Sequence, residues 1–213
     1  MLLKLYGCPN TRSMRAAWAL EEAQAEYEYQ PVPLLKGGGR RPSFLRVNPS
    51  GKVPVLADGD FILTESVAIC TYIGDLFPAS GLTPPWGTKD RARYNQWMAF
   101  AVAELEQPLW TIAKHRFALP KELRVTAAEE GAKWDFGRAC RVLDKGIAGK
   151  EHILGERFTA ADILLAHSLA WAASARIPVE SAALEAYADK LLARPAVARA
   201  KAREAQSETE NAI

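Results

Sequence analysis

Two short motifs hold the backbone and side-chain groups that are best placed to bind a small ligand. Val53-Pro54 stands where a strand is expected. Because proline has no N–H to donate, it indicates a strand edge, a bulge or a cis peptide that turns the Val53 backbone groups outward. Thr64-Glu65-Ser66 opens a helix, where N–H groups and a hydroxyl can bind a carboxylate and Glu65 can pair with an ammonium. These groups fit the amino-acid end of a ligand, while their ordinary structural roles are a strand start and a helix cap.

A third motif, Gly7-Cys8-Pro9-Asn10-Thr11-Arg12-Ser13, joins the first expected strand to the first expected helix. A turn of this kind directs hydroxyls and N–H groups at a common point, which can stabilise an anion such as a thiolate. The same pattern is also typical of a well-capped helix without any ligand. Both interpretations stay open from the residues alone.

The cysteines and histidines do not indicate a metal centre. Cys8, Cys70 and Cys140 are an odd number, widely spaced and without a Cys-x-x-Cys pair, so neither a disulfide framework nor a zinc site is indicated. The three histidines also lack metal-ligand spacing. We therefore expect no metal cofactor.

The segments that must position these motifs alternate between strands and helices up to residue 77. Apolar patterning predicts strands at 2–6 and 27–32, helices at 13–25 and 65–77, and a short helical turn at 43–47. Asp58-Gly59 between apolar runs predicts a hairpin of two further strands. The glycine-rich stretch 36–41 is expected to have no ordered structure. The predicted order is βαβαββα, a sheet with helices packed against it.

The rest of the chain is predicted to be helical. Residues 78–87 hold three prolines and two glycines and read as a linker. Helices are expected at 88–113, 122–148, 160–175 and 184–193, with a last turn or two after Pro195 and fraying from about Glu204. Thr159-x-x-Asp162 has the form of a capping box. The predicted domains are therefore 1–77, with sheet and helices, and 88–213, all helical.

Composition excludes several classes of protein. The chain of 213 residues is 49% apolar and 24% charged, which is typical of a globular protein. Its 27 basic and 25 acidic residues are intermingled and give a net charge of +2, so we expect no nucleic-acid partner. No run approaches the ~18 apolar residues of a membrane span, and the N-terminus lacks the pattern of a secretory signal. We therefore expect a cytoplasmic protein with no membrane partner.

Three motifs, taken in order, resemble those of the soluble glutathione transferase superfamily, with a bacterial-like serine/threonine-type site. They are Asn48-Pro49-Ser50-Gly51-Lys52-Val53-Pro54-Val55-Leu56, Leu63-Thr64-Glu65-Ser66 and Phe158-Thr159-Ala160-Ala161-Asp162. The resemblance extends to about residue 200. It implies a thioredoxin-like N-terminal domain followed by an all-helical domain, glutathione as co-substrate, and a homodimer.

The resemblance also implies which residues bind glutathione. Pro54 corresponds to the family's cis-proline, and Val53 to the residue whose backbone binds the cysteinyl part of glutathione. Glu65 and Ser66 correspond to the pair that holds the γ-glutamyl end. Lys52 and Arg40 are candidates for the glycyl carboxylate, although Lys52 could equally be a solvated loop lysine.

The catalytic position has four candidates in the first turn. The family's pattern Asn-Ser-Arg-Ser-x-Arg, counted back from the helix that contains Arg15, places its serine at Thr11, whose hydroxyl can donate to the glutathione sulfur. Asn10 and Ser13 are alternatives, since a one-residue gap would shift the assignment. Cys8-Pro9 resembles the start of the motif in thiol-transferring relatives but lies three residues early. We therefore interpret Cys8 as a spectator.

The leading hypothesis is an enzyme of detoxification that conjugates the glutathione thiolate to an apolar electrophile or runs a related glutathione-dependent reaction. A first alternative is a glutathione-dependent disulfide reductase that uses Cys8 to exchange a mixed disulfide. A second is a non-catalytic binding or scaffold protein that keeps the fold.

Overall fold

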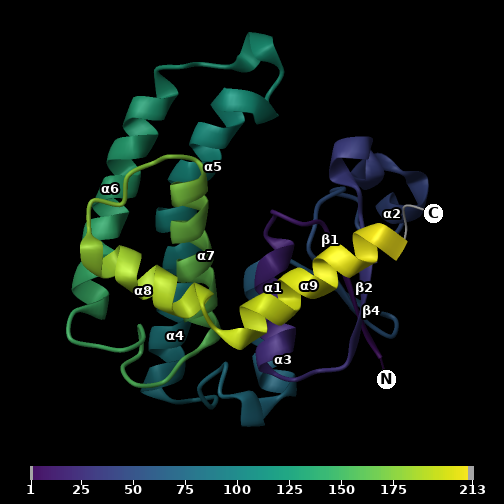
Figure 1. Ribbon diagram of the computed structural model, residues 1–213, viewed down its shortest axis with the longest axis horizontal. Helices are drawn as coiled ribbons and strands as arrows, with labels where there is room; N and C mark the ends of the chain where they lie inside the picture. The colour runs from purple at the N-terminus through teal and green to yellow at the C-terminus, as the bar shows by residue number, and fades with distance from the viewer. Residues whose placement is uncertain (1, 211–213) are drawn as a thin grey trace. The chain divides into compact units, whose positions relative to one another are not determined.

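The computed structural model describes residues 2–210 and is built on a four-stranded mixed sheet (Figure 1). The strands lie in the order β2-β1-β3-β4, with β1 parallel to β2 and antiparallel to β3. Their bounds are β1 (Leu3–Gly7), β2 (Tyr27–Pro31), β3 (Val55–Asp58) and β4 (Phe61–Thr64). The helices of this part are α1 (Ser13–Glu22), α2 (Pro42–Leu45) and α3 (Ser66–Leu76). The predicted βαβαββα order is confirmed.

The sheet is covered on both faces because its strands carry apolar side chains on both. In β1, Leu3 and Leu5 are fully buried and lie on the face that α1 covers. On the other face, Tyr6 packs with Phe44 of α2, together with the buried Val32 and Val55. The alternation along β1 therefore separates two small cores, and the segment between β2 and β3 folds over the second.

The glycine-rich stretch is ordered, so the expectation of an unordered loop is wrong. It forms two 3-10 turns, η1 (Leu34–Lys36) and η2 (Gly38–Arg40). Gly39 packs directly on the backbone of Gly51, whose carbonyl oxygen would overlap any Cβ at position 39. Glycine is required here for this close approach, and the contact with a segment twelve residues later supplies the order that the local sequence does not indicate.

The second half is helical, with bounds that differ from the predicted ones. The bounds are α4 (Lys89–Phe100), η4 (Ala101–Glu106), α5 (Gln107–Ala113), η5 (Lys114–Ala118), η6 (Lys121–Leu123), α6 (Ala128–Ile147), α7 (Ala160–Ser174) and α8 (Ala182–Leu192). The first helical run continues to Ala118 through two π-helical segments. Helix α6 starts at Ala128 rather than near Glu122, because the Arg124 guanidinium donates to the carbonyls of Arg116, Phe117 and Leu119 and holds a loop there. Within residues 2–210, no helix is both long and apolar enough to cross a membrane.

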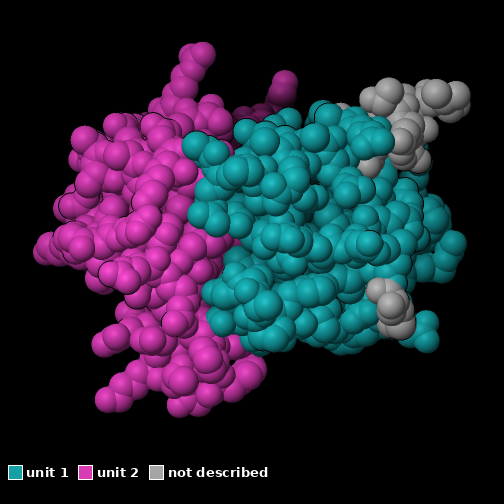
Figure 2. Space-filling view, turned by 60° about the horizontal axis from the view of Figure 1, so that its bottom comes forward, with its two compact units in different colours: residues 1–83, 193–213 teal, residues 84–192 magenta. Residues whose placement is uncertain are grey.

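The chain forms two compact units (Figure 2), one of residues 1–83 and 193–213 and one of residues 84–192. The last helix, α9 (Pro195–Glu210), thus belongs with the sheet and packs on α1 and β2. The sequence predicted only a last turn or two and fraying from Glu204, and this is wrong for the described residues. Ala196, Val197 and Ala200 are buried, and so is Glu204. The helix is stabilised by packing that its local sequence does not reveal.

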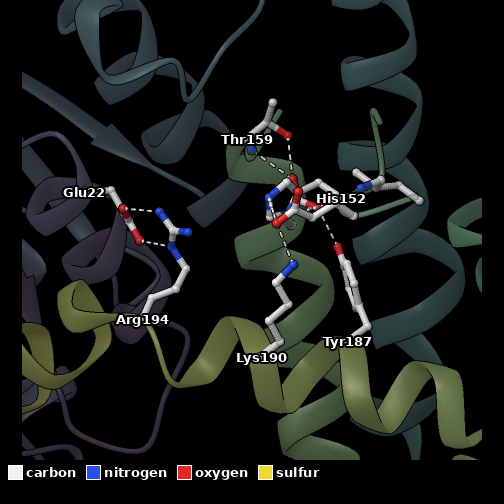
Figure 3. Close-up of polar contacts among 9 residues, drawn as sticks. Glu22, His152, Thr159, Tyr187, Lys190 and Arg194 are labelled. Atoms are coloured by element: carbon white, nitrogen blue, oxygen red, sulfur yellow. Dashed lines mark hydrogen bonds and ion pairs between the residues drawn. The ribbon is translucent and has the colours of Figure 1, made fainter. Parts of the chain in front are cut away.

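Charged side chains tie the start of α9 to the end of α1 (Figure 3). Arg194 donates to both carboxylate oxygens of Glu22, at 2.6 and 2.8 Å, and Trp18 Nε1 donates to one of them at 2.8 Å. Burial alone would raise the pKa of Glu22, but the hydrogen bonds from Arg194 and Trp18 outweigh it and hold the pKa below its usual value. Glu22 is therefore ionised in the folded protein.

Replacing Arg194 with glutamine is expected to lower the free energy of unfolding by roughly 1–2 kcal/mol at neutral pH, because it removes two hydrogen bonds to a carboxylate. A lowered pKa stabilises the fold above the unfolded-state value and is lost as pH falls through the folded value. The difference between wild type and Arg194→Gln should therefore shrink in acid. Urea unfolding of both proteins over a range of pH measures this difference in the free energy of unfolding. Arg93→Gln is the control, because its pair with Asp90 is exposed and such pairs contribute about 0–1 kcal/mol.

Candidate active site

The sheet brings the three chemical motifs to one edge, the one at which β1 and β4 end and β3 begins. β1 and β3 pair with Tyr6 opposite Val55, so continuing that register by two residues places Val53 opposite Cys8. β3 and β4 pair with Val55 opposite Thr64, so Glu65 follows at the same end. The end of β1, the start of β3 and the end of β4 therefore meet. Residues far apart in the sequence become neighbours through strand pairing alone.

The Val53-Pro54 motif presents backbone groups at this edge. The peptide bond between the two residues is cis, as the resemblance implied. Pro54 is buried and Val53 half-buried, just before β3 begins at Val55. Neither the N–H nor the C=O of Val53 takes part in a backbone hydrogen bond among residues 2–210. Both can therefore pair with an extended peptide ligand, as a strand edge does.

Glu65 and Ser66 stand at the N-terminus of α3 in an unusual conformation. Glu65 has φ 67° and ψ 117°, in the left-handed range that a non-glycine residue rarely adopts. Its carboxylate is exposed and makes no hydrogen bond or ion pair with any residue of the described chain. Strain of this kind is concentrated at ligand-binding sites. An ammonium group of a ligand would give this carboxylate a partner.

Ser66 is almost fully buried and accepts a hydrogen bond from Arg15 of α1. The Arg15 guanidinium donates to Ser66 Oγ across 3.3 Å, and Arg15 itself is 0% exposed. Since Ser66 Oγ accepts this hydrogen bond, its own hydroxyl hydrogen is left to be donated. A carboxylate at the N-terminus of α3 would accept that hydrogen bond. The positive end of the helix dipole would stabilise its charge as well.

The turn after β1 is held by hydrogen bonds among its own residues. Thr11 Oγ1 donates to the Cys8 carbonyl oxygen at 2.6 Å and lies 2.9 Å from Ser13 Oγ. The Cys8 N–H donates to Ser13 Oγ at 3.1 Å. Ser13 is fully buried, whereas Thr11 and Cys8 are half-buried and Asn10 is exposed with φ 59°. Thr11 has one hydroxyl hydrogen, so donation to a ligand requires its rotation away from Cys8.

The three cysteines differ sharply in accessibility. Burial raises the pKa of Cys70 to about 12, an effect only partly offset by Arg15. Burial likewise raises the pKa of Cys140 to about 12. Both are therefore neutral thiols at physiological pH, with no role as nucleophiles. Cys8 is half-buried and lies in the site itself, so the question of cysteine chemistry concerns Cys8.

Arg40 and Lys52 each directly follow one of the two glycines, Gly39 and Gly51, whose backbones are in contact. Both side chains are exposed, and neither is paired within the part of the chain that the structure describes. Lys52 directly precedes Val53 in the chain. Among the side chains that the structure describes, no group of three or more could hold a metal ion.

Arg15 is the residue of this site that sequence reasoning missed. The sequence places it in the helix 13–25, among Met14, Ala17 and Trp18, where a charged residue would ordinarily lie on the solvated face. The signal that could have found it is position: Arg15 lies one turn into the helix that begins at the site. Only the structure shows that the guanidinium points inward to Ser66.

A sheet of this topology with a cis-proline motif beside two helix N-termini defines the thioredoxin-like class of protein. Residues 1–75 match the family described as "Glutathione S-transferase, N-terminal domain". Glutathione S-transferase GST-4.5 of Xanthomonas campestris is 30% identical over 192 residues, covering 90% of this chain and 93% of that protein. The chain belongs to the glutathione S-transferase family.

Two further relatives bear on the chemistry. The structure of a sphingomonad glutathione S-transferase complexed with glutathione is 36% identical, with a TM-score of 0.79, and the match covers 94% of this chain and 98% of that one. Disulfide-bond oxidoreductase YfcG of Escherichia coli is 31% identical over 169 residues, which are 76% of each protein.

Proposed function

We propose that the protein binds glutathione along Val53, Glu65 and Ser66 and transfers its thiolate to an apolar electrophile. The observation that carries this function is the meeting of three groups at one sheet edge: the Val53 backbone, the Glu65 carboxylate and the N-terminal turn of α1. Each has a complement in a tripeptide with an ammonium, two carboxylates and a thiol. The sphingomonad relative, whose structure contains glutathione, supports the same ligand.

The chemistry requires a thiolate at neutral pH. A free thiol has a pKa of about 8.5, and a helix N-terminus together with a hydroxyl donor lowers it. In the proposed mechanism the glutathione thiol loses its proton to solvent, and Thr11 donates its hydroxyl hydrogen to the thiolate after turning from the Cys8 carbonyl. The sulfur then forms a bond to the electrophilic carbon as the leaving group departs with its electron pair.

Calorimetric titration with glutathione and conjugation of chlorodinitrobenzene, followed by absorbance, test the function directly. We expect saturable binding with one site per chain and turnover that depends on both substrates. A protein that neither binds glutathione nor conjugates a panel of apolar electrophiles would contradict it. Binding without turnover over that panel would instead identify a non-catalytic scaffold.

Replacing Thr11 with valine is expected to lower kcat/KM for conjugation about 10- to 100-fold, because it removes one donor to the developing anion. Thr11→Ser keeps the hydroxyl and the hydrogen bond to Cys8, and should retain most of the activity. Cys8→Ser should change conjugation by about twofold or less, since a spectator makes no transition-state contact. Equal activity of Thr11→Val and wild type would remove Thr11 from the mechanism and return Asn10 to consideration, with Ser13 as a buried positioning residue.

Disulfide exchange through Cys8 is the second candidate function, favoured by the half-buried Cys8 thiol within the site and by the similarity to the Escherichia coli disulfide-bond oxidoreductase. In that reaction the Cys8 thiolate attacks a disulfide, whose S–S bond breaks and releases one thiolate, and the glutathione thiolate then attacks the mixed disulfide and releases the Cys8 thiolate. Loss of disulfide reduction in Cys8→Ser, with conjugation intact, would establish it. Unchanged reduction in Cys8→Ser would rule it out.

The assembly implied by the family resemblance is a homodimer, and we propose it for this chain as well. Sedimentation at micromolar concentration should give about twice the chain mass of 23.4 kDa. A mass near that of a single chain would contradict the dimer. The cytoplasmic location and the division into domains 1–77 and 88–213 stay predictions.

A further inference from the structure

The side chain of Tyr29 in β2 lies against the end of β1, where the turn of the candidate active site begins. β1 and β2 pair with Leu5 opposite Tyr29 and with Gly7 opposite Pro31. A Cβ at position 7 would overlap the hydroxyl and two ring carbons of Tyr29. Glycine at this position therefore lets the end of the Tyr29 ring touch the backbone that continues into the turn.

The Tyr29 hydroxyl is held by the last helix. It donates to Glu204 Oε1 of α9 at 3.1 Å, and both residues are buried. α9 lies across α1 and packs on β2 (Figure 1). Burial raises the pKa of Tyr29, and the negative charges of Glu204 and of an ionised Cys8 raise it further. The hydroxyl is thus a donor at every physiological pH, and its ring lies between the last helix and the turn.

Hydrogen bonds connect the end of β1 to the rest of the turn. The Gly7 carbonyl oxygen accepts from the Val32 N–H at 2.7 Å, which fixes the last residue of the strand. The next residue, Cys8, donates its N–H to Ser13 Oγ at 3.1 Å and accepts from the Thr11 hydroxyl at 2.6 Å. A displacement of Gly7 would therefore move Cys8, and Thr11 with it.

We infer that Tyr29 is a positioning residue of the active site, and that its hydrogen bond to Glu204 makes α9 part of the support that places Thr11. This inference rests on the proposed function, in which Thr11 donates its hydroxyl hydrogen to the glutathione thiolate. Tyr29 acts through the backbone of Gly7 and takes no part in bond making. Without its hydrogen bond, the end of β1 is held less firmly and the Thr11 hydroxyl is less well aligned with the sulfur.

The expected effect falls on the thiol of bound glutathione rather than on its binding. In the proposed function Val53 and Glu65 hold the peptide, and they lie next to β3 and β4 rather than on β1. The affinity for glutathione should therefore change by about twofold or less. A weaker hydrogen bond from Thr11 stabilises the thiolate less, so the pKa of the bound thiol should rise.

Titration of the ultraviolet absorbance of the thiolate, with glutathione bound, measures that pKa. Tyr29→Phe keeps the ring against Gly7 and removes only the hydroxyl. We expect it to raise the pKa of the bound thiol by about 0.5 to 1 unit. At a pH below both values the thiolate fraction then falls about 3- to 10-fold, and kcat for conjugation should fall by the same factor while KM for glutathione stays within about twofold.

Tyr27→Phe is the matched control. Tyr27 lies two residues earlier in β2, on the same face of the sheet, and is equally buried. Its hydroxyl also donates to a carboxylate, that of Glu21, at 3.0 Å. It pairs with Leu3 at the start of β1, four residues before Gly7. Tyr27→Phe should lower the melting temperature about as much as Tyr29→Phe, but leave the pKa of the bound thiol and kcat unchanged.

Variants of Glu204 test the same hydrogen bond from its other end. Glu204→Gln keeps an acceptor for the Tyr29 hydroxyl and should retain the wild-type pKa of the bound thiol. Glu204→Leu removes the acceptor and should reproduce the shift of Tyr29→Phe. The double variant Tyr29→Phe, Glu204→Leu should shift the pKa no further, as expected for two partners of one interaction. Saturable binding of glutathione, measured for each variant, establishes that it folds.

The outcomes distinguish this inference from the function on which it rests. A thiol pKa that rises in Tyr29→Phe and not in Tyr27→Phe supports the inference, and these two variants decide it if Glu204→Leu does not fold. If wild type lowers the pKa of the thiol and both tyrosine variants behave alike, Tyr29 only stabilises the fold, and the proposed function stands. If wild type binds no glutathione, the proposed function fails as well.

Discussion

Replacing Asp162 with alanine is expected to lower the free energy of unfolding by about 3–5 kcal/mol, because it removes a buried charge from a set of donors that face no water. Asp162 is 0% exposed. Its carboxylate accepts hydrogen bonds from the backbone N–H groups of Ile153 and Thr159, each at 2.8 Å, and from the Tyr187 hydroxyl at 2.6 Å. The Thr159 hydroxyl donates to it as well, at 3.0 Å, so four buried donors would lose this acceptor.

Urea unfolding measures the loss as a shift of the midpoint at constant m-value. Tyr187→Phe removes a single hydrogen bond from the same carboxylate and should cost only about 1 kcal/mol. Burial, and then the negative charge of Asp162, raise the pKa of Tyr187, so its hydroxyl remains a donor at every physiological pH. Glu130→Ala, in an exposed pair with Lys133, is the surface control. A loss below about 1 kcal/mol for Asp162→Ala would show that water replaces the carboxylate.

The Asp162 cluster shows which part of a structure the sequence can predict. Thr159-x-x-Asp162 predicts a capping box, and the structure contains it, with Thr159 and Asp162 bonded to each other's backbone. That motif is local, so its spacing suffices. The bond from Tyr187 in α8 joins a residue 25 positions away (Figure 3). No local pattern marks Tyr187 as a partner, because the packing of α7 on α8 decides it.

The same distinction explains the two elements whose structure the sequence did not predict. The segment 36–41 is ordered through the contact of Gly39 with Gly51, and α9 is ordered through its packing on α1 and β2. In both, the local composition favours disorder or fraying, and the stabilising partner is distant in sequence. Tertiary contacts commonly override weak local preference in this way.

For the candidate site, residue types could be predicted more fully than roles. The motifs around Val53 and Glu65 meet at one sheet edge because strand pairing brings them there. The role of Thr11 depends on which acceptor its single hydrogen faces, and no spacing rule fixes that. Position at the start of the first helix is the one signal for Arg15 in the sequence; the contact of its buried guanidinium with Ser66 could not be predicted, because a buried charge breaks the apolar pattern of the helix.

Replacing Glu65 with glutamine is expected to weaken glutathione binding about 10- to 100-fold, which corresponds to about 1.4–2.8 kcal/mol. The carboxylate is exposed and unpaired among the described residues, so it gains its partner only when the ammonium of the γ-glutamyl group arrives. Glutamine keeps the size of the side chain but loses its charge. The substitution therefore removes the attraction while leaving the shape of the site unchanged.

A ligand without the ammonium makes this prediction specific. Wild type should bind glutathione more tightly than the glutaryl analogue that lacks the α-amino group, and Glu65→Gln should abolish most of that preference, as expected for two partners in a double-mutant cycle. Glu130→Gln, at an exposed position of α6, should preserve the preference. If Glu65→Gln weakened the binding of glutathione and of the glutaryl analogue equally, Glu65 would act by shaping the start of α3. If it weakened glutathione alone, the left-handed residue at this helix start would be the group that recognises the amino end of the substrate.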